Sequence, residues 1–147
     1  MMSGIRGKHT NPEMILRKGL HAMGFRYRLH AKLPGRPDLA FPSLNAVLFV
    51  HGCFWHGHRC HLFKWPKSRD DFWRTKINGN ALRDRQCVEA LRTAGWRVGV
   101  VWECALKGKS RLPLIHVVQK CASWLRSGKQ TFELAGKDEA GTSIRIF

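Results

Sequence analysis

The chain has 147 residues, 44% of them hydrophobic, so it can bury one sizeable core but is short for two, and we expect a single domain over residues 1–147. Lys and Arg outnumber Asp and Glu by 26 to 10, and the formal charge of +16 points to a polyanionic partner, first of all nucleic acid. No apolar run approaches a membrane-spanning length and the first residues do not resemble a signal peptide, which argues against a membrane partner and for a cytosolic protein.

The first half of the chain predicts one helix followed by three strands. HTNPE (9–13) is typical of a helix start, with Thr10 or Asn11 as cap, and the helix is expected to run to about Gly24. FRYRL (25–29) alternates apolar and basic residues and predicts a half-exposed strand. DLAF (38–41) and NAVLFV (45–50) then predict a hairpin centred between Leu44 and Asn45.

The second half predicts one or two helices, a buried strand and a last helix. The helical segments are SRDDFWRTKI (68–77) and ALRDRQCVEALRTAG (81–95), the second with Cys87, Ala90, Leu91 and Ala94 on one face. WRVGVVWE (96–103) predicts the strand, and residues 112–128 predict an amphipathic helix. No element is assigned to the polar tail, 129–147. This order predicts an α/β fold with one mixed sheet flanked by helices.

Asp38 is the only acidic residue between Met14 and Arg69. In a hairpin centred between Leu44 and Asn45, Asp38 faces His51, with Cβ atoms about 4.5–5.5 Å apart. A carboxylate beside an imidazole suits a site for Mg²⁺, which prefers oxygen ligands and assists phosphodiester chemistry. The alternative is that Asp38 pairs with Arg36 or caps the start of its strand.

The segment FVHGCFWHGHRC (49–60) contains the residue types of a zinc site. Cys53, His58 and Cys60 have the spacing C-x4-H-x-C. Cys53 comes after the predicted strand LFV, and Cys104 comes after the predicted strand VVWE. If these strands are neighbours, their ends can bring the four residues together. Four protein ligands make a closed, structural site. The alternative is unligated cysteines with surface histidines. Two further cysteines, Cys87 and Cys121, are interpreted as core thiols.

Two histidines of this segment remain for catalysis if His58 binds zinc. His51 and His56 lie on the side of Asp38, and Gly57 lets the chain turn so that His56 need not share the zinc. A neutral imidazole can take a proton from a water that attacks phosphorus. For a single histidine an exposed or core position is the more common role, but a cluster beside a lone carboxylate favours catalysis.

Large aromatic residues accompany the histidines. Phe54 and Trp55 lie in a loop of glycine, histidine and cationic residues, and aromatics on such a loop can wedge between base steps of DNA. Trp73 can join them, although either Phe72 or Trp73 is expected to pack inward. Trp96, Trp102 and Trp124 are assigned to the core.

Five motifs, PGRPD, HGCFWHGHRC, FWRTKI, GWRVGVVWECAL and MSGIRGKHTNPE, together resemble the very short patch repair (Vsr) DNA mismatch endonucleases, over residues 2 to about 126. The resemblance implies a restriction-endonuclease-like core with a zinc-stapled loop. It also implies nicking of one strand of duplex DNA 5′ to the thymine of a T:G mismatch, in a prokaryotic, nucleoid-associated protein. The roles it implies are Asp38 and the Val50 carbonyl for Mg²⁺; His56, His51 and Glu13 in catalysis; Cys53, His58, Cys60 and Cys104 for Zn²⁺; and Phe54, Trp55 and Trp73 as DNA wedge.

Two departures from the family bear on these roles. Val50 stands where the best-known member has threonine, and valine suffices if the metal uses only the backbone carbonyl. The chain starts at Met1-Met2, whereas relatives often carry a longer basic arm. Two other functions remain open: a non-catalytic zinc-containing DNA-binding module, and a relative that nicks other mismatches or DNA structures. A nickase needs one active site, so we expect a monomer, with mismatch-repair proteins as possible partners.

Overall fold

The computed structural model describes residues 12–58 and 60–137, and its centre is a five-stranded mixed sheet. The strands are β1 (Arg28–Leu29), β2 (Leu39–Phe41), β3 (Ala46–His51), β4 (Arg97–Trp102) and β5 (Thr131–Leu134). They lie in the order β1-β2-β3-β4-β5. The β1-β2 and β2-β3 pairs are antiparallel, whereas β3-β4 and β4-β5 are parallel. The predicted α/β class and mixed sheet are therefore confirmed.

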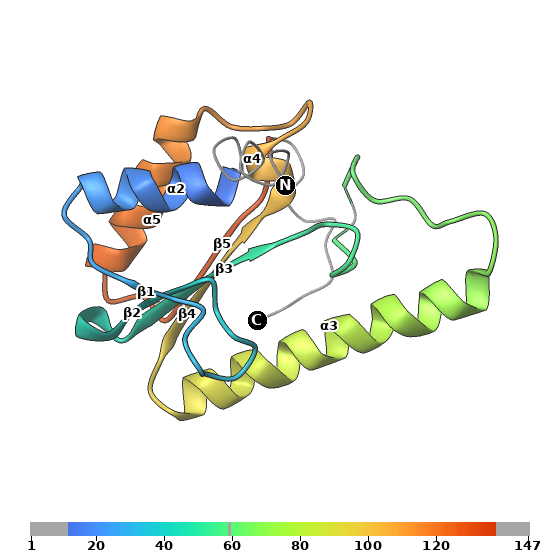
Figure 1. The fold of residues 1–147 in the computed structure, drawn as a ribbon, viewed down its shortest axis with the longest axis horizontal. Coiled ribbons are helices and arrows are strands. Elements are labelled where there is room, and N and C mark those ends of the chain that lie inside the picture. The colour runs from blue at the N-terminus through green and yellow to red at the C-terminus, as the bar shows by residue number, and fades with distance from the viewer. Residues whose placement is uncertain (1–11, 59, 138–147) are drawn as a thin grey trace, which may run out of the picture.

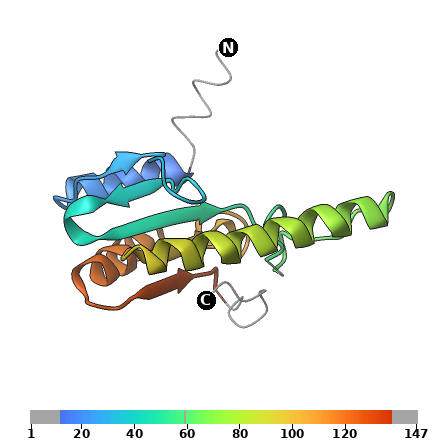
Figure 2. The same ribbon diagram turned by 90° about the horizontal axis from the view of Figure 1, so that it is seen from below.

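Helices cover both faces of the sheet. On one face lie α2 (Pro12–Ala22) and α5 (Leu114–Arg126), and on the other runs α3 (Asp70–Thr93), as Figures 1 and 2 show. The short helix α4 (Glu103–Leu106) follows β4 directly, and a 3₁₀ turn, Pro42–Leu44, joins β2 to β3. One end of α3 extends beyond the sheet, on the side of the loop that leads into it (Figure 2). No described helix is long and apolar enough to cross a membrane.

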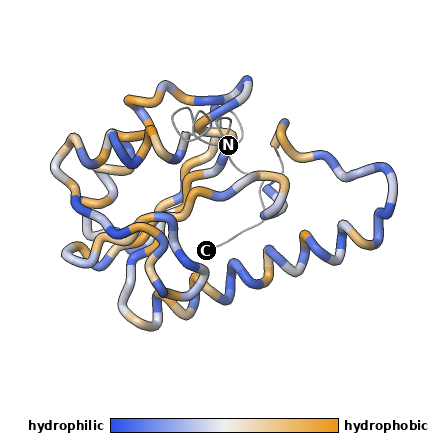
Figure 3. The backbone as a smooth tube through the Cα atoms, in the orientation of Figure 1, coloured by the Kyte–Doolittle hydropathy of each residue, from blue (hydrophilic) through white to orange (hydrophobic). Residues whose placement is uncertain are grey.

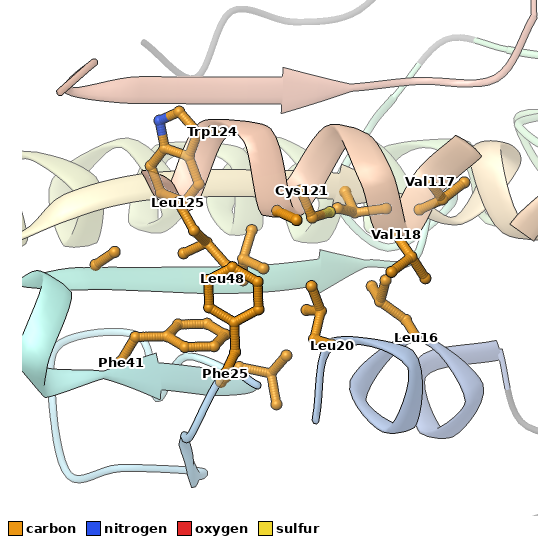
Figure 4. Packing of buried hydrophobic residues seen from close by; sticks show 14 of the residues in the cluster. Leu16, Leu20, Phe25, Phe41, Leu48, Val117, Val118, Cys121, Trp124 and Leu125 are labelled. Atoms are coloured by element: carbon orange, nitrogen blue, oxygen red, sulfur yellow. The ribbon is translucent and has the colours of Figure 1, made fainter. Parts of the chain in front are cut away.

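The buried strands separate two apolar clusters. In β3, Leu48 points into the cluster under α2 and α5, whereas Val47 and Phe49 point toward α3. Figure 4 shows Leu16 and Leu20 of α2 on the side of Val118 and Cys121 of α5, with Leu125 next to Leu48. Successive residues of a strand point to opposite faces, so a strand buried on both sides is apolar throughout. Figure 3 accordingly shows the central strands as hydrophobic, whereas α3 is mainly hydrophilic.

Gly99 lies at a point of close packing in this sheet. A Cβ atom there would lie 2.8 Å from Leu48 Cδ2 and 2.9 Å from Trp124 Cζ3. Trp124 of α5 therefore packs directly against the backbone of β4, and the absent side chain is what allows the helix to approach so closely.

The predicted register of the hairpin is wrong by two residues. Phe41 pairs with Ala46 and Leu39 with Leu48, so Asp38 is in line with Phe49 instead of His51. The cause is Asn45, which has a left-handed backbone (φ 51°) and donates its N–H to Pro42 O at 3.2 Å, so it belongs to the turn and not to the strand. A shift of two residues preserves the face of the sheet, and Asp38 still lies on the side of His51.

The remaining elements follow the sequence with several corrections. The first predicted strand is reduced to Arg28–Leu29, and the two candidate helical segments form the single helix α3. The buried face of α3 is Ile77, Ala81, Val88 and Leu91, so the predicted face with Ala90 and Ala94 is wrong, because both are exposed. The proposed caps Thr10 and Asn11 lie outside the described residues.

One strand was not predicted at all. β5 lies in the tail to which no element was assigned, and it pairs in parallel with β4. Three of its four residues are partly buried and Glu133 is exposed, so the strand has little hydrophobic pattern. Glu133 of this strand accepts a hydrogen bond from Trp102 Nε1 at 2.6 Å, a contact between residues 31 positions apart. The pairing of β5 with β4 therefore depends on tertiary contacts and not on the local sequence pattern.

Candidate active site and metal centre

The two parallel strands β3 and β4 end at the same edge of the sheet, where His51 pairs with Trp102. Cys53 and Cys104 each follow two residues later, and the structure brings them together with His58 and Cys60. The ligand atoms of these four residues all lie within 4.8 Å of one another. The predicted fourth ligand is therefore in place, and the group can hold one metal ion.

The chemistry of this group fits a tetrahedral ion with sulfur and nitrogen ligands. Cys53, His58 and Cys104 are fully buried. His58 Nδ1 lies 3.7 Å from Cys104 Sγ, close to the separation of about 3.6 Å that tetrahedral Zn–S and Zn–N bonds would give. Within the described residues, His58 Nε2 is a buried nitrogen with no hydrogen-bond partner, which is costly for a polar group, and a set of sulfur and imidazole ligands suits a soft cation.

Electrostatics within the cluster already favour a thiolate. A hydrogen bond from Cys53, a contact with His58 and the backbone N–H of Gly136 (3.2 Å) lower the pKa of the Cys104 thiol to about 4. Cys53 donates that hydrogen bond, and together with burial this raises the pKa of its own thiol. A thiolate is the form of cysteine that binds metal, so Cys104 is prepared for ligation.

The backbone of the loop separates the two histidines that flank Gly57. The loop closes by hydrogen bonds from His58 N to Cys53 O at 2.9 Å and from His56 N to Gly52 O at 3.2 Å. Gly57 has φ 71°, a left-handed conformation that glycine adopts without a steric cost. As predicted, His58 turns to the cysteines, whereas His56 joins His51 on the other side of the loop.

His51 and His56 form a stacked pair, with ring centroids 3.9 Å apart and planes at 19°. Burial is the main cause that lowers the pKa of His51 to about 3, so this ring is neutral near pH 7. Nearly parallel rings do not aim their in-plane nitrogen lone pairs at one shared point. The ligand atoms of His51, His56 and Asp84 all lie within 4.8 Å of one another, but the stacking disfavours binding of one ion by both imidazoles.

Asp84 of α3 completes this pair and was missed in the sequence. Its Oδ2 lies 2.6 Å from His56 Nδ1, and both side chains are largely buried. The sequence contains a hint of this role. Asp84 falls at the helical spacing of the buried residues Ala81 and Val88, and an acidic side chain on a buried helix face usually has a partner. A carboxylate at one ring nitrogen fixes the tautomer of the imidazole and leaves the other nitrogen as proton acceptor.

Asp38 is held at the edge of β2 by the backbone of β3. Its Oδ2 accepts a hydrogen bond from Val50 N at 2.6 Å. Burial raises the pKa of this carboxyl above its usual 3.8, the Val50 hydrogen bond opposes the rise, and the charge of Glu13 adds to it. Within the described residues Asp38 forms no ion pair with Arg36, so the alternative of a simple Arg36 pair is wrong.

A cavity of about 210 Å³ connects these groups. Asp38, Val50, His51, His56 and Asp84 line it, together with Arg36. Cys87 also lines this cavity and is only partly buried, so its assignment as a core thiol is wrong, whereas Cys121 is buried as predicted. The cavity therefore gathers two carboxylates, two imidazoles and one cation around a volume that an ion and a phosphate can share.

Glu13 lies in the first turn of α2, near this cavity but not in its lining. Its Oε2 accepts a hydrogen bond from Arg17 at 3.1 Å. Its charge reaches Asp38, as the effect on the pKa of that carboxyl shows. The structure thus places Glu13 close enough to Asp38 to affect its charge.

The predicted aromatic residues gather beside the cavity. Phe54 lies 5.1 Å from Trp55 and 5.6 Å from Trp73, measured between ring centroids, and Trp55 is 47% exposed. Asn80 of α3 donates a hydrogen bond to Trp55 O at 2.8 Å and so holds this loop on the helix. Phe72 is exposed while Trp73 is partly buried, which agrees with the expectation that one of them packs inward.

Comparisons with known proteins identify related sequences. The model of the family described as DNA mismatch endonuclease Vsr matches residues 1–62. The type II nicking enzyme V.XorIIP of Xanthomonas oryzae pv. oryzae is 54% identical over 107 residues, which cover 72% of this chain and 79% of the relative. The DNA mismatch endonuclease Vsr of Escherichia coli K12 is 42% identical over 125 residues, 84% of this chain and 80% of the relative.

The chain belongs to the Vsr family. It is accordingly an endonuclease that nicks DNA, and its substrate is the polyanion that the charge of +16 indicated. Another relative, the type II nicking enzyme V.NmeAIP of Neisseria meningitidis, is 45% identical over 111 residues, 75% of this chain and 79% of the relative. Membership in the Vsr family favours the enzyme over a non-catalytic DNA-binding module.

Proposed function

We propose that this endonuclease nicks one strand of duplex DNA 5′ to the thymine of a T:G mismatch, with Mg²⁺ at Asp38 and a structural Zn²⁺ at the cysteine cluster. The observation that carries the proposal is the cavity that Asp38, the His51–His56 stack and Asp84 line together, with the exposed Trp55 directly before His56 in the loop. The name of the Escherichia coli relative supports mismatched DNA as substrate.

His56 is the general base in this proposal. Asp84 Oδ2 accepts the Nδ1 proton at 2.6 Å, so Nε2 takes a proton from the water that attacks phosphorus. The negative Asp84 then stabilises the imidazolium that forms, as a carboxylate does for a catalytic histidine in hydrolases. His51 stays neutral and stacks on His56, so it limits the freedom of the base and can donate a hydrogen bond to the phosphate.

Asp38 supplies the anionic oxygen for the cation. Its carboxylate and the carbonyl of Val50 both belong to residues that line the cavity, and hard oxygen ligands are what Mg²⁺ prefers. When bound there, Mg²⁺ neutralises charge that develops on the phosphate and orients water. Because a backbone carbonyl needs no particular side chain, Val50 serves as well as threonine. Glu13 acts from α2 through its charge on the Asp38 side of the cavity.

Cys53, His58, Cys60 and Cys104 hold Zn²⁺ in a closed, four-ligand site. With zinc bound, these residues would connect the loop after β3 to the short helix α4, which contains Cys104. The described residues between β3 and α3 form no helix or strand, and zinc can contribute on the order of 10 kcal/mol to the folding of such a segment. Since His56 and His58 are separated by a single residue, the same ion also fixes where the general base lies.

The aromatic cluster and the positive charge bind the duplex. Phe54, Trp55 and Trp73 insert beside the mismatch, where weaker pairing lowers the cost of unstacking. Neutralisation of phosphates by Lys and Arg makes the affinity fall with salt, with a slope of about −0.9 per phosphate contacted. Cleavage of one strand needs one such site, which is consistent with a monomer, and mismatch-repair proteins remain candidate partners.

The test is a nicking assay on duplexes that carry each possible mismatch, labelled separately on the two strands. We expect a single nick, 5′ to the thymine of T:G, that needs Mg²⁺ and is absent when EDTA removes it. Equal nicking of another mismatch would assign the enzyme to the second class considered from the sequence, a relative that cuts other mismatches or DNA structures. Nicking that persists with no divalent ion would contradict the role of Asp38 as a metal ligand.

A further inference from the structure

Arg36 stands in the loop between β1 and β2, two residues before Asp38, and this loop is held firmly against the rest of the molecule. Arg36 N donates a hydrogen bond to Leu33 O at 2.9 Å. At Gly35 the backbone lies so close to α3 and β3 that a Cβ atom would be 3.1 Å from Cys87 Cβ and 3.2 Å from Phe49 Cε1. The position of Arg36 over the cavity is therefore set by packing.

The backbone of Arg36 is in the left-handed region, with φ 48°. Glycine or asparagine adopts this conformation at lower cost, whereas a long side chain there is uncommon. Strained backbone of this kind is concentrated at functional sites, where the surrounding structure holds it. An arginine at this position is therefore best explained by what its side chain does.

The charge of Arg36 has no ion-pair partner among the described residues. It is the only Lys or Arg among the described residues that line the cavity, which otherwise contains the carboxylates Asp38 and Asp84. Asp38 does not use Arg36, because its Oδ2 accepts the N–H of Val50 instead. Within residues 12–58 and 60–137 no group accepts a hydrogen bond from the guanidinium, and the residue is exposed. The cation is thus available to a ligand in the cavity.

We propose that Arg36 is a catalytic residue that binds the phosphate at the nick site and stabilises the charge that develops on it during cleavage. The inference rests on the proposed function, in which Asp38 and His56 surround that phosphate. A guanidinium presents two parallel N–H donors that match two phosphate oxygens, which a lysine ammonium does not. Donors aimed at developing charge in a partly desolvated site contribute more to the rate than to ground-state binding.

The test separates the rate of cleavage from the affinity for DNA. Single-turnover nicking at saturating enzyme is measured for Arg36→Gln, Arg36→Lys and the control Lys32→Gln, and the dissociation constant for the same duplex is measured without Mg²⁺. Lys32 is an exposed cation of the same loop that does not line the cavity. We expect Arg36→Gln to slow nicking by about 10²–10³-fold with less than about tenfold weaker binding, Arg36→Lys to fall between, and Lys32→Gln to nick at the wild-type rate.

Arg36→Gly tests whether such a loss comes from misfolding. Glycine accepts the left-handed backbone, so the melting temperature should equal or exceed that of the wild type while nicking falls as in Arg36→Gln. A low melting temperature together with lost activity would show that Arg36 has a structural role and would overturn the inference.

Asp38→Asn distinguishes failure of this inference from failure of the proposed function. If Asp38→Asn is inactive while Arg36→Gln nicks at the wild-type rate, or loses only affinity, the proposed site stands and the role of Arg36 is wrong. If Asp38→Asn nicks normally, the proposed site itself is wrong, and the inference about Arg36 is overturned with it.

Discussion

Substitution of Asp38 by Asn and by Ala separates the two things that its carboxylate does. In the folded protein Oδ2 accepts the N–H of Val50 at 2.6 Å, and in the proposed reaction the carboxylate holds Mg²⁺. Asparagine keeps an oxygen that can accept the Val50 N–H but removes the negative charge. Alanine removes both. Both variants should therefore lose activity, but only the alanine variant should also lose stability.

The magnitudes follow from these contacts. Loss of the metal ligand should slow nicking by about 10³-fold or more, because charge neutralisation by a metal ion contributes several kcal/mol to the transition state. In Asp38→Ala the partly buried N–H of Val50 loses its acceptor, which costs about 1–3 kcal/mol. At about 2–4 °C per kcal/mol for a chain of this size, the melting temperature should fall by about 2–12 °C.

The Asn variant should be as stable as the wild type or more stable near pH 7. Burial raises the pKa of Asp38, so the ionised carboxylate is disfavoured in the folded state. For an acid with a raised pKa, the contribution to stability is present below the unfolded pKa, near 3.8, and is lost as the pH rises through the folded pKa. The advantage of Asp38→Asn should therefore shrink as the pH falls toward 3.8.

These expectations are checked by thermal unfolding without added Mg²⁺ between pH 4 and 8, with single-turnover nicking of a labelled T:G duplex as the activity measurement. An Asn variant that melts well below the wild type at pH 7 would show that the charge itself stabilises the fold, contrary to the burial argument. An Asn variant that nicks at the normal rate would remove Asp38 from the mechanism.

Four further substitutions test other parts of the structure. Asp84→Asn should slow nicking by about 10²–10³-fold with unchanged DNA affinity, because His56 loses its charged partner; a normal rate would leave Asp84 without a catalytic role. Cys104→Ser should lose bound zinc and melt at a lower temperature than the wild type. The control Cys121→Ala, at a buried cysteine outside the cluster, should keep the full zinc content. One equivalent of zinc in Cys104→Ser would disprove the ligand set. Gly99→Ala should lower the free energy of unfolding in urea by about 1–3 kcal/mol through contact with Leu48 and Trp124, while Gly128→Ala, with open space around it, should change it little. Trp55→Ala should weaken binding to a mismatched duplex by about 1–3 kcal/mol and leave the zinc content unchanged; equal binding would exclude Trp55 from the wedge.

The sequence by itself determined the local and chemical features of this protein. Apolar patterning indicated the α/β class, the buried strands β3 and β4 and the amphipathic helix α5. The ligand types and spacing of Cys53, His58 and Cys60 indicated a candidate metal site, and the reasoning that neighbouring strands end at the same edge of the sheet placed Cys104 beside them. Most of these features depend on residues that are close together in the chain. The two strands are visible as continuous apolar runs, so their burial can be predicted from the sequence alone.

The tertiary structure decided how the distant parts meet. The hairpin register depended on one left-handed residue, Asn45, which no hydrophobic pattern reveals. Strand β5 forms by pairing with β4. Asp84 reaches His56 because α3 packs against the loop, where Asn80 also contacts Trp55. Such contacts join residues about thirty positions apart, and their geometry is set by packing of the whole core rather than by local preference.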